Sequence, residues 1–246
     1  MMNFSVTWKD ESVSTNTELK EAAKRGARIG SVLAAKHQTG GRGRMERSFS
    51  SKEGGLYASI IFPCHSPNDA GRLTTFAAVA VARSVERICP VNLKIKWVND
   101  LLVNGKKICG ILAEGVACED GFCAVVGFGV NLYNELPKEL DGIASTLLKE
   151  CGMKISPPTL LDAVLDEMSG FDNADFDEIM EEYRHRSAIL GKKITVIHHL
   201  GENYEAEAVE IDADGALLVK RLDGGETVRL FSGEVSTRFL ESKDEK

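Results

Sequence analysis

The dipeptide Asn104-Gly105 constrains the fold of this chain more than any other feature. It separates two apolar runs, and Asn-Gly in that setting is the strongest short-range signal for a β-hairpin with a two-residue turn. Such a turn fixes which residues of the two strands face each other. The predicted pairs are Val103 with Lys106, Leu102 with Lys107, Asp100 with Cys109, and Asn99 with Gly110.

Charged side chains are unusually dense on this hairpin. In the predicted register Lys107 shares a face with Asp100 and Lys96, whereas Trp97 lies on the opposite face and is expected in the core. Asp100 and Lys107 are diagonal neighbours at about 7 to 8 Å, within reach of long side chains. The alternative interpretation is that Asp100 and Lys107 form a solvent-exposed ion pair that contributes little to stability. Gly110 leaves a gap where a ligand can approach the sheet.

Composition and charge narrow the class of protein. The 246-residue chain has a net charge of −7 and 27% charged residues, which is typical of a globular protein and not of one that coats nucleic acid. Three arginines nevertheless crowd one short segment, which favours a local site for a small anion. The chain has no apolar run of membrane-spanning length, no signal peptide and no cysteine pair spaced for zinc. We therefore expect a cytoplasmic protein with reduced thiols.

The arginines belong to the segment "HQTGGRGRMER" at 37–47, which has three glycines in four positions. Glycine permits close backbone approach, so successive N–H groups can converge on an anion while arginines add donors. The segment is not a Walker A loop, because no Gly-Lys-Ser/Thr follows it. Similarly, "GFGVNL" at 127–132 lacks the third glycine of a dinucleotide fingerprint.

Periodicity and capping residues divide the chain into two parts at Gly191. Before it we expect helices over 12–25, 69–89, 159–169 and 173–188, the last capped by Asn173, and strands over 31–38, 54–62 and 121–133. After it, short alternating segments with Gly or Asp at the breaks indicate a small β-barrel or sandwich. The expected units are a larger domain over 1–190, a β module over 191–240 and a charged tail over 241–246.

Six patches together resemble the biotin protein ligases, enzymes that attach biotin to a lysine of a carrier domain. They are Ser14-Thr15-Asn16, "HQTGGRGR" at 37–44, "KWVND" at 96–100, "KKICGIL" at 106–112, "GFGVN" at 127–131 and "SGEV" at 232–235. Their order and spacing cover nearly the whole chain and are far more specific than any single patch. Larger family members carry an N-terminal helix-turn-helix, for which Met1 to Asp10 leaves no room, so the resemblance is to a short form without a DNA-binding domain.

The resemblance implies an α+β fold, with a mixed or antiparallel sheet packed with helices as in class II synthetases, followed by a small SH3-like β-barrel. It implies that biotin and ATP give biotinyl-5′-AMP and pyrophosphate, and that a carrier lysine then displaces AMP. The expected partners are biotin, ATP with Mg²⁺ as co-substrate and a biotin carboxyl carrier domain. No prosthetic group, nucleic acid or membrane is expected, and a homodimer is left open.

By position, the resemblance also assigns site residues. The biotin site comprises Ser14, Thr15, Asn16, Gln38, Gly41, Arg42, Gly43, Arg44, Lys107 and Gly110. The ATP and adenylate site comprises Arg42, Arg44, Arg47, Lys96, Asn99, Lys107 and Asn131. The catalytic residues are Lys107, Arg44 and Asp100, and Lys107 is expected between the biotin carboxylate and the α-phosphate. Asp100 either orients Lys107 or holds the magnesium ion; no other metal ligand is expected from the protein.

Three residues depart from the family's usual pattern: Val98 stands for a proline, Glu46 for a glycine and Phe49 for a tryptophan. These changes bear on loop conformation and rate, not on the reaction class. One rival function is a lipoate or octanoate ligase or transferase, which shares the fold but lacks the "GRGR" loop in this form. The other is a catalytically silent biotin-binding regulator, which is expected to have lost Lys107 or Arg44.

Overall fold

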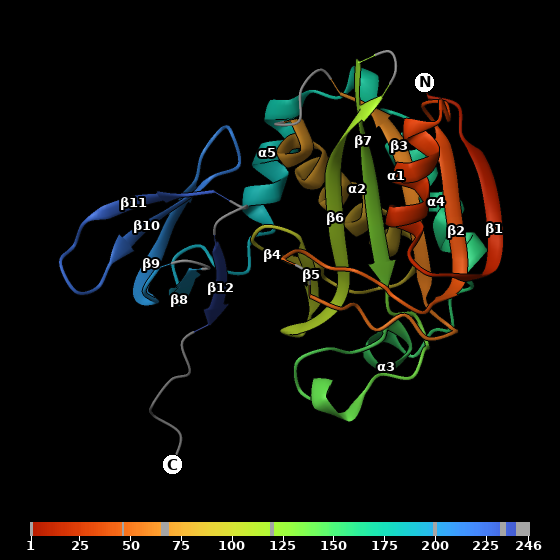
Figure 1. Ribbon diagram of the computed structural model, residues 1–246. Coiled ribbons are helices and arrows are strands. Elements are labelled where there is room, and N and C mark those ends of the chain that lie inside the picture. The colour runs from red at the N-terminus through yellow and green to blue at the C-terminus, as the bar shows by residue number, and fades with distance from the viewer. Residues whose placement is uncertain are drawn as a thin grey trace.

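The protein contains two β-sheets of unequal size, which Figure 1 shows side by side. The structure is a computed structural model and describes residues 2–45, 47–64, 69–118, 121–198, 201–231 and 235–239. The larger sheet has seven strands in the order β1-β2-β3-β7-β6-β5-β4, and the smaller has five in the order β11-β10-β9-β8-β12. Within the described residues, no helix has both the length and the apolar character needed to cross a membrane.

The larger sheet is mixed, because β1 runs parallel to β2 and all the other neighbouring strands are antiparallel. Its strands are β1 (Ser5–Ser12), β2 (Ser31–Gln38), β3 (Leu56–Pro63), β4 (Lys94–Lys96), β5 (Asp100–Val103), β6 (Lys106–Cys118) and β7 (Gly121–Val130). Most residues of β3 and β7 are buried because helices cover both faces of the sheet.

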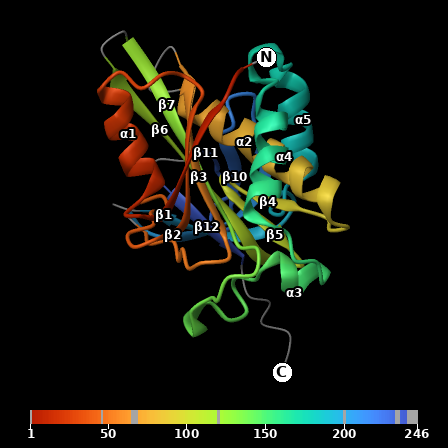
Figure 2. The ribbon, with the colours of Figure 1, turned by 90° about the vertical axis from the view of Figure 1, so that its right-hand side faces the viewer.

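Figure 2 shows helix α1 on one face of the larger sheet and helices α2, α4 and α5 on the other. The α-helices are α1 (Thr15–Lys24), α2 (Ala70–Ile88), α3 (Leu147–Cys151), α4 (Pro157–Met168) and α5 (Phe176–His185), with 3₁₀ turns η2 (Lys138–Leu140) and η3 (Phe171–Asn173). Alternation along β7 divides its side chains between the two faces. Val125 packs with α1, whereas Val126 and Phe128 join the larger core around α2.

Helix α1 begins where the sequence predicts. The Ser14 side chain caps it by accepting a hydrogen bond from the Thr17 N–H. Leu19 and Ala23 then face the sheet and form a small core with β-strand residues that include Ile61. Because α1 starts partway along the sheet, the strands beyond its N-terminus are left without a helix over them.

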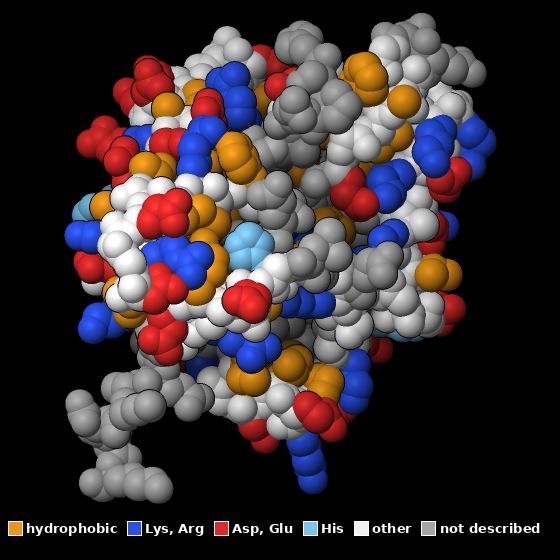
Figure 3. Space-filling model, turned by 60° about the vertical axis from the view of Figure 1, so that its left-hand side comes forward, with side chains coloured by type: hydrophobic (Ala, Val, Ile, Leu, Met, Phe, Trp, Pro, Cys, Tyr) orange, Lys and Arg blue, Asp and Glu red, His pale blue; other side chains and the backbone are white. Residues whose placement is uncertain are grey.

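The smaller sheet is antiparallel throughout. Its strands are β8 (Lys193–His198), β9 (Tyr204–Ile211), β10 (Leu217–Arg221), β11 (Thr227–Leu230) and β12 (Val235–Phe239). Two hydrogen bonds tie it to the larger unit: Trp97 Nε1 donates to the Gly215 carbonyl at 2.9 Å, and Arg184 Nε donates to the Ile211 carbonyl at 2.6 Å. Figure 3 shows Lys and Arg side chains mixed with Asp and Glu on the face that this sheet presents.

The structure confirms the α+β class and most expected elements, and it corrects the cap of the last helix. Asp175, not Asn173, caps α5, because its carboxylate accepts the N–H groups of Asp177 and Glu178 while Asn173 lies in η3. Strand β1 was not expected, because seven of its eight residues are exposed and show no buried alternation. The expected tail at 241–246 and the "SGE" at 232–234 lie outside the described residues.

We predict that Tyr183→Phe destabilises the fold. The Tyr183 hydroxyl is buried and donates to the Val98 carbonyl at 2.8 Å, so its loss leaves a buried acceptor unpaired. The free energy of unfolding, measured by urea denaturation, should fall by about 1 to 3 kcal/mol. Tyr133→Phe is the matched control, because the Tyr133 hydroxyl makes no hydrogen bond with the described residues. Equal stability of the two variants would contradict this assignment.

Candidate active site

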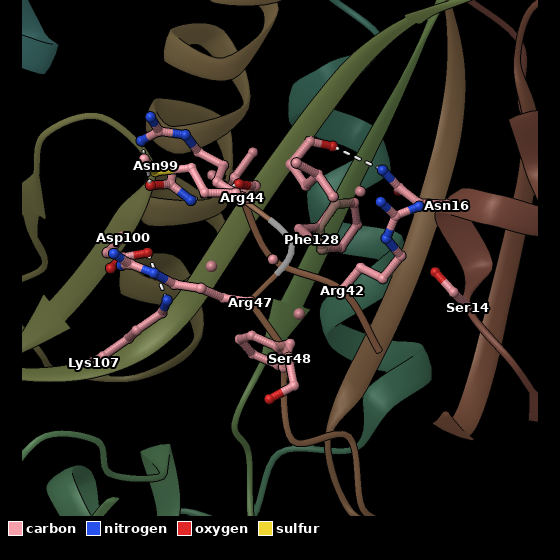
Figure 4. A pocket seen from close by; sticks show the side chains of 18 of the residues that line it. Ser14, Asn16, Arg42, Arg44, Arg47, Ser48, Asn99, Asp100, Lys107 and Phe128 are labelled. Atoms are coloured by element: carbon pink, nitrogen blue, oxygen red, sulfur yellow. Dashed lines mark hydrogen bonds and ion pairs between the residues drawn. The ribbon is translucent and has the colours of Figure 1, made fainter. Parts of the chain in front are cut away.

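A pocket with an empty volume of about 940 Å³, open space at its mouth included, lies on the α1 face of the larger sheet. It is bounded by the N-terminus of α1, residues 42–45 and 47–49, the β4–β5–β6 edge of the sheet and one residue of β12. The part of the sheet that forms its floor carries glycines on β6 and β7. Figure 4 shows the side chains converging on this floor from several elements.

The glycines of the floor make room for polar groups that lie directly on the sheet. Gly110 pairs with Gly129 across β6 and β7. A Cβ at Gly110 would approach Lys107 Nζ and the Phe49 ring to 3.2 Å, and a Cβ at Gly129 would approach that ring to 2.6 Å. A Cβ at Gly127 would overlap the Asn16 side chain. Any other residue at these positions would therefore displace a side chain of the site.

The hairpin forms at Asn104-Gly105, but part of its predicted register is wrong. Val103–Lys106 and Leu102–Lys107 pair as expected, whereas Asp100 faces Gly110 and Leu101 faces Cys109. The register shifts because Ile108 is one extra residue on β6, which is a β-bulge. The bulge turns Cys109 into the core, where burial raises the pKa of its thiol, and it leaves Gly110 beside Asp100.

Lys107 and Asp100 meet as predicted. Their Nζ and Oδ1 atoms are 2.7 Å apart, and the two side chains are 29% and 25% exposed, so the pair faces the pocket and not open solvent. The Lys107 backbone is held from outside the sheet by the Ile143 carbonyl and the Ser145 N–H, at 2.9 and 3.0 Å. Phe49 lies over the glycine floor with its ring centroid 5.6 Å from Lys107 Nζ, so this phenylalanine fills the position as an aromatic neighbour of the lysine.

The α1 end of the pocket is polar, and apart from Arg42, which points toward Asn16 in Figure 4, its lining side chains are uncharged. Ser59, fully buried on β3, contacts Asn16 Oδ1 at 2.6 Å and Thr15 Oγ1 at 2.8 Å. Gln38 Oε1 accepts the Thr15 N–H at 2.8 Å, and Gln38 Nε2 donates to Ser51 Oγ at 2.8 Å. An amide oxygen only accepts, so the Ser59 hydroxyl donates to Asn16 Oδ1 and the Thr15 hydroxyl donates to Gln38 Oε1 at 3.1 Å, while the two hydroxyl groups also contact each other. The network fixes the orientation of all these groups.

Glu114 on β6 fixes the Asn16 amide. Asn16 Nδ2 donates to the Leu112 carbonyl at 3.1 Å and to the Glu114 carboxylate at 3.0 Å, and Lys20 Nζ lies 2.6 Å from the other carboxylate oxygen. Both amide protons of Asn16 are thereby used, which leaves its oxygen facing Ser59 and the pocket. Burial acts to raise the pKa of the Glu114 carboxyl, but the hydrogen bonds from Lys20 and Asn16 outweigh it and lower the pKa below 4.5.

The arginine segment folds as a small hairpin over the floor. Arg42 and Ser48 form an antiparallel bridge, the Gly43 N–H donates to the Arg47 carbonyl at 2.7 Å, and the Phe49 N–H donates to the Gly41 carbonyl at 2.9 Å. The expectation that successive glycine N–H groups converge on an anion is therefore wrong at Gly43. The Gly43 N–H is used within the hairpin, so it is not available to a ligand. Glu46 lies outside the described residues.

The opposite end of the pocket is strongly cationic. Among the described lining residues the basic ones at this end are Arg44, Arg47, Lys96 and Lys107, with Arg42 between them and Asn16, and the single acid is Asp100. Figure 4 shows Lys107 and Arg47 pointing toward Asp100, and Arg42 pointing toward Asn16. Arg44 Nη1 donates to Asn99 Oδ1 at 3.3 Å.

Burial and mutual repulsion act on these cations. Burial lowers the pKa of Arg44, with Asp100 opposing the shift. Burial also lowers the pKa of Lys96, again with Asp100 opposing it and Lys107 adding to it. Because the cations outnumber the one carboxylate, the pocket carries an unbalanced positive charge that a bound anion would neutralise.

All but two of the expected site residues line this pocket. Gly41 lies beside the pocket. A Cβ there would collide with the Phe49 carbonyl and Ser51 Oγ at 2.5 Å, so glycine is needed for the chain at Gly41 to approach the segment 49–51. Asn131 is buried outside the lining, and its carbonyl accepts the Leu147 N–H of the segment that clamps Lys107. Trp97 is buried in the core as expected, and it also reaches the pocket wall.

The structure adds residues that the sequence did not reveal. They are Ser59, Ser51 and Glu114, which orient the uncharged end, and Thr237, which reaches the pocket from β12. The contacts of Ser59 and Glu114 with Asn16 span 43 and 98 positions of sequence, so no local pattern marks them. For the glycine floor the sequence did carry a signal. Side chains alternate along a strand, so Gly127 and Gly129 must lie on the same face of β7.

A metal held by the protein alone does not fit this site. No group of three or more His, Cys, Asp or Glu side chains able to hold a metal ion exists among the described residues. Asp100 is the single carboxylate among the described lining residues, and it already contacts Lys107. A magnesium ion that arrives with a polyphosphate would take most ligands from phosphate and water, which is its usual mode of binding.

The two ends suit a reaction between two anionic groups. A fixed amide and hydroxyl network recognises a neutral polar group by hydrogen bonding, whereas fixed cations stabilise phosphate and carboxylate oxygens. Holding a carboxylate next to a phosphate favours attack of the one on the other, because proximity replaces a bimolecular encounter.

We predict a pH-dependent effect of Glu114→Gln. The folded pKa of Glu114 is lowered, so its carboxylate stabilises the fold fully above pH 4.5, and this contribution is lost as the pH falls through the lowered pKa. The variant should be less stable than the wild type by about 1 to 2 kcal/mol at neutral pH, and the difference should shrink on acidification. Urea denaturation over a pH series measures this, with the exposed Glu139→Gln as control. A pH-independent difference would exclude the assigned role.

Comparisons with known proteins point to the same chemistry. Residues 10–131 match the biotin/lipoate A/B protein ligase family, and residues 189–238 match the biotin protein ligase C-terminal domain. The biotin–[acetyl-CoA-carboxylase] ligase of Mycobacterium tuberculosis is 33% identical over 90% of this chain and 85% of that protein. The bifunctional ligase/repressor BirA of Bacillus subtilis is 32% identical over 91% of this chain and 72% of that protein.

A solved structure agrees over almost the full length. The biotin protein ligase from Aquifex aeolicus in complex with biotin and ATP aligns with a TM-score of 0.79 and 26% identity, over 98% of this chain and 100% of that chain. These findings confirm the resemblance that the six sequence patches indicated. The chain belongs to the biotin protein ligase family.

Proposed function

We propose that this pocket joins biotin to ATP and then delivers the biotinyl group to a lysine of a carrier domain. The protein is an ATP-dependent ligase of the biotin protein ligase family. The observation that carries the proposal is the continuity, within one pocket, of an uncharged end around Asn16 and a cationic end around Lys107. Biotin has a neutral ureido group at one end and a carboxylate at the other, which matches this division.

In our proposal the ureido ring of biotin lies at the network of Thr15, Asn16, Gln38 and Ser59. That network holds both donors and acceptors in fixed orientations, as a group with N–H and C=O atoms requires. The carboxylate then points along the glycine floor toward Lys107. Gly41 and Gly110 serve by leaving space, and Asn131 serves by anchoring the segment beside Lys107.

In the first step a biotin carboxylate oxygen attacks the α-phosphorus of ATP, and the bond to pyrophosphate breaks. Negative charge accumulates on the phosphoryl oxygens, so a preorganised cation aimed at them lowers the barrier. Lys107 takes this role, and Asp100 orients its ammonium group through the 2.7 Å contact. Arg44 and Arg47 bind the phosphate chain from the segment that covers the floor. Magnesium enters with ATP as part of the substrate.

In the second step the uncharged amine of a carrier lysine attacks the acyl carbon of biotinyl-5′-AMP. The C–N bond forms, AMP leaves with its phosphate, and the amine gives up a proton. This step needs no nucleophilic side chain of the enzyme. We propose a biotin carboxyl carrier domain as acceptor, with residues 1–190 as the catalytic unit and 191–240 as the unit that closes the nucleotide side. The cysteines form no disulfide within the described residues, and we propose that the reaction takes place in the cytoplasm.

We predict that Lys107→Ala forms biotinyl-AMP at least about a hundredfold more slowly, the usual cost of removing one preorganised donor. The rate is measured by mass spectrometry after rapid mixing of protein, biotin and ATP without acceptor. Lys106→Ala is the matched control, because Lys106 is next in sequence, lies outside the pocket lining and has its Nζ 3.8 Å from Glu150. Near wild-type adenylation by Lys107→Ala, with both variants folded, would refute the role of the lysine.

A further inference from the structure

Glu150 is a carboxylate on α3 that lies outside the pocket lining, yet its side chain is only 8% exposed. Glu150 Oε2 accepts a hydrogen bond from Asn104 Nδ2 at 2.7 Å, and the Ser145 side chain hydrogen-bonds the same carboxylate. These two hydrogen bonds, with Ser145 first, are the main reason that the pKa of the Glu150 carboxyl lies below 4.5. Glu150 is therefore a charged acceptor that joins two separate segments of the chain.

Both of these segments hold Lys107. Asn104 is in the turn of the hairpin, three positions before Lys107. On the other side, the Ser145 N–H donates to the Lys107 carbonyl at 3.0 Å, and the Lys107 N–H donates to the Ile143 carbonyl at 2.9 Å. Glu150 thus connects the tip of the hairpin to the segment that clamps the Lys107 backbone.

Helix α3 gives Glu150 a fixed base. Leu147 is fully buried, and the N–H groups of Leu147 and Leu148 donate to the carbonyls of Asn131 and Leu132 at 2.9 and 2.8 Å. The helix is therefore anchored to the chain that leaves β7, so its carboxylate can hold the hairpin tip against the sheet.

A third neighbour of the carboxylate contributes less. Lys106 Nζ lies 3.8 Å from Glu150 Oε1, and the Lys106 side chain is 44% exposed. Ion pairs that are open to solvent contribute little to stability. The bonds from Asn104 and Ser145 are therefore the ones that hold the hairpin tip.

We propose that Glu150 is a positioning residue for adenylation, which acts on the reaction through Lys107. This inference rests on the proposed function, because that function gives Lys107 its role. A shift of the hairpin tip would move the start of β6, and with it the Lys107 ammonium group beside Asp100. Catalytic groups must be held within about 0.5 Å of the productive geometry, so a small shift is enough to slow the reaction.

Two variants loosen the connection to different extents. Glu150→Ala removes both hydrogen bonds, whereas Asn104→Gly removes one and keeps the turn, because glycine readily adopts the positive φ of 50° found at Asn104. We expect Glu150→Ala to form biotinyl-AMP about tenfold more slowly at saturating biotin and ATP, within the factor of about a hundred that a 1 Å misplacement can cost. Asn104→Gly should be slowed less. Lys149→Ala is the control, since Lys149 is exposed on the same helix, and it should react like the wild type. Equal rates for Glu150→Ala and the wild type would overturn the inference.

Combination with Lys107→Ala separates positioning from a general loss of structure. If Glu150 acts through Lys107, the double variant Lys107→Ala/Glu150→Ala should form biotinyl-AMP at the same rate as Lys107→Ala alone. A further drop of about tenfold in the double variant would show two independent effects, and it would also overturn the inference.

Amide hydrogen exchange tests the connection without turnover. In Glu150→Ala the Lys107 N–H should exchange about tenfold faster, the factor that corresponds to loss of one hydrogen bond to a charged group. The Ile111 N–H, which donates to the Asn99 carbonyl at 2.9 Å, should exchange as in the wild type. Unchanged exchange at Lys107 would contradict the inference. A wild type that forms no biotinyl-AMP would instead defeat the proposed function, while the exchange rates would still decide whether Glu150 holds the Lys107 backbone.

Discussion

The site depends on holding several positive charges close together at one place in a chain with a net charge of −7. Five basic side chains and one carboxylate line the described pocket. Two like charges about 4 Å apart repel by about 4 kcal/mol at an effective dielectric constant of about 20, so this concentration must be enforced by the fold. Asp100 offsets part of the repulsion at Lys107, and the backbone clamp at Ile143 and Ser145 fixes the lysine from behind. A polyphosphate would relieve the remainder, which explains why the site suits ATP.

Glycine and the β-bulge make this arrangement possible on a sheet. The extra residue Ile108 sends Cys109 into the core and leaves Gly110 beside Asp100, which clears space for the Lys107 ammonium group. Gly127 does the same for Asn16 at the other end of the floor. The sheet therefore holds the side chains of the pocket floor, while the arginines lie on a short hairpin above it. A rigid floor below a loop that covers the ligand suits a reaction whose intermediate must be kept from water.

Sequence alone predicted the elements that depend on local patterns. Ser14 as a cap, the strand over 31–38 and the turn at Asn104-Gly105 all follow from nearby residues. The bulge at Ile108 was not predicted, because both registers keep Asp100 and Lys107 on one face, and only the observed one turns Cys109 into the core. The Ser59 and Glu114 contacts could not be predicted either, since they join strands that are distant in sequence. Asn131 was matched to the site by position, yet its side chain lies outside the pocket lining.

The most direct test of the account is pyrophosphate release from ATP by the purified protein, without acceptor, in the presence of biotin, lipoate or octanoate. The account predicts release with biotin alone, because the uncharged end is built around hydrogen-bonding groups that match a ureido ring and that an aliphatic acyl chain would leave unpaired. Release with lipoate or octanoate and not with biotin would keep the role of Lys107 and contradict the substrate. No release with any of the three acids would contradict adenylation itself.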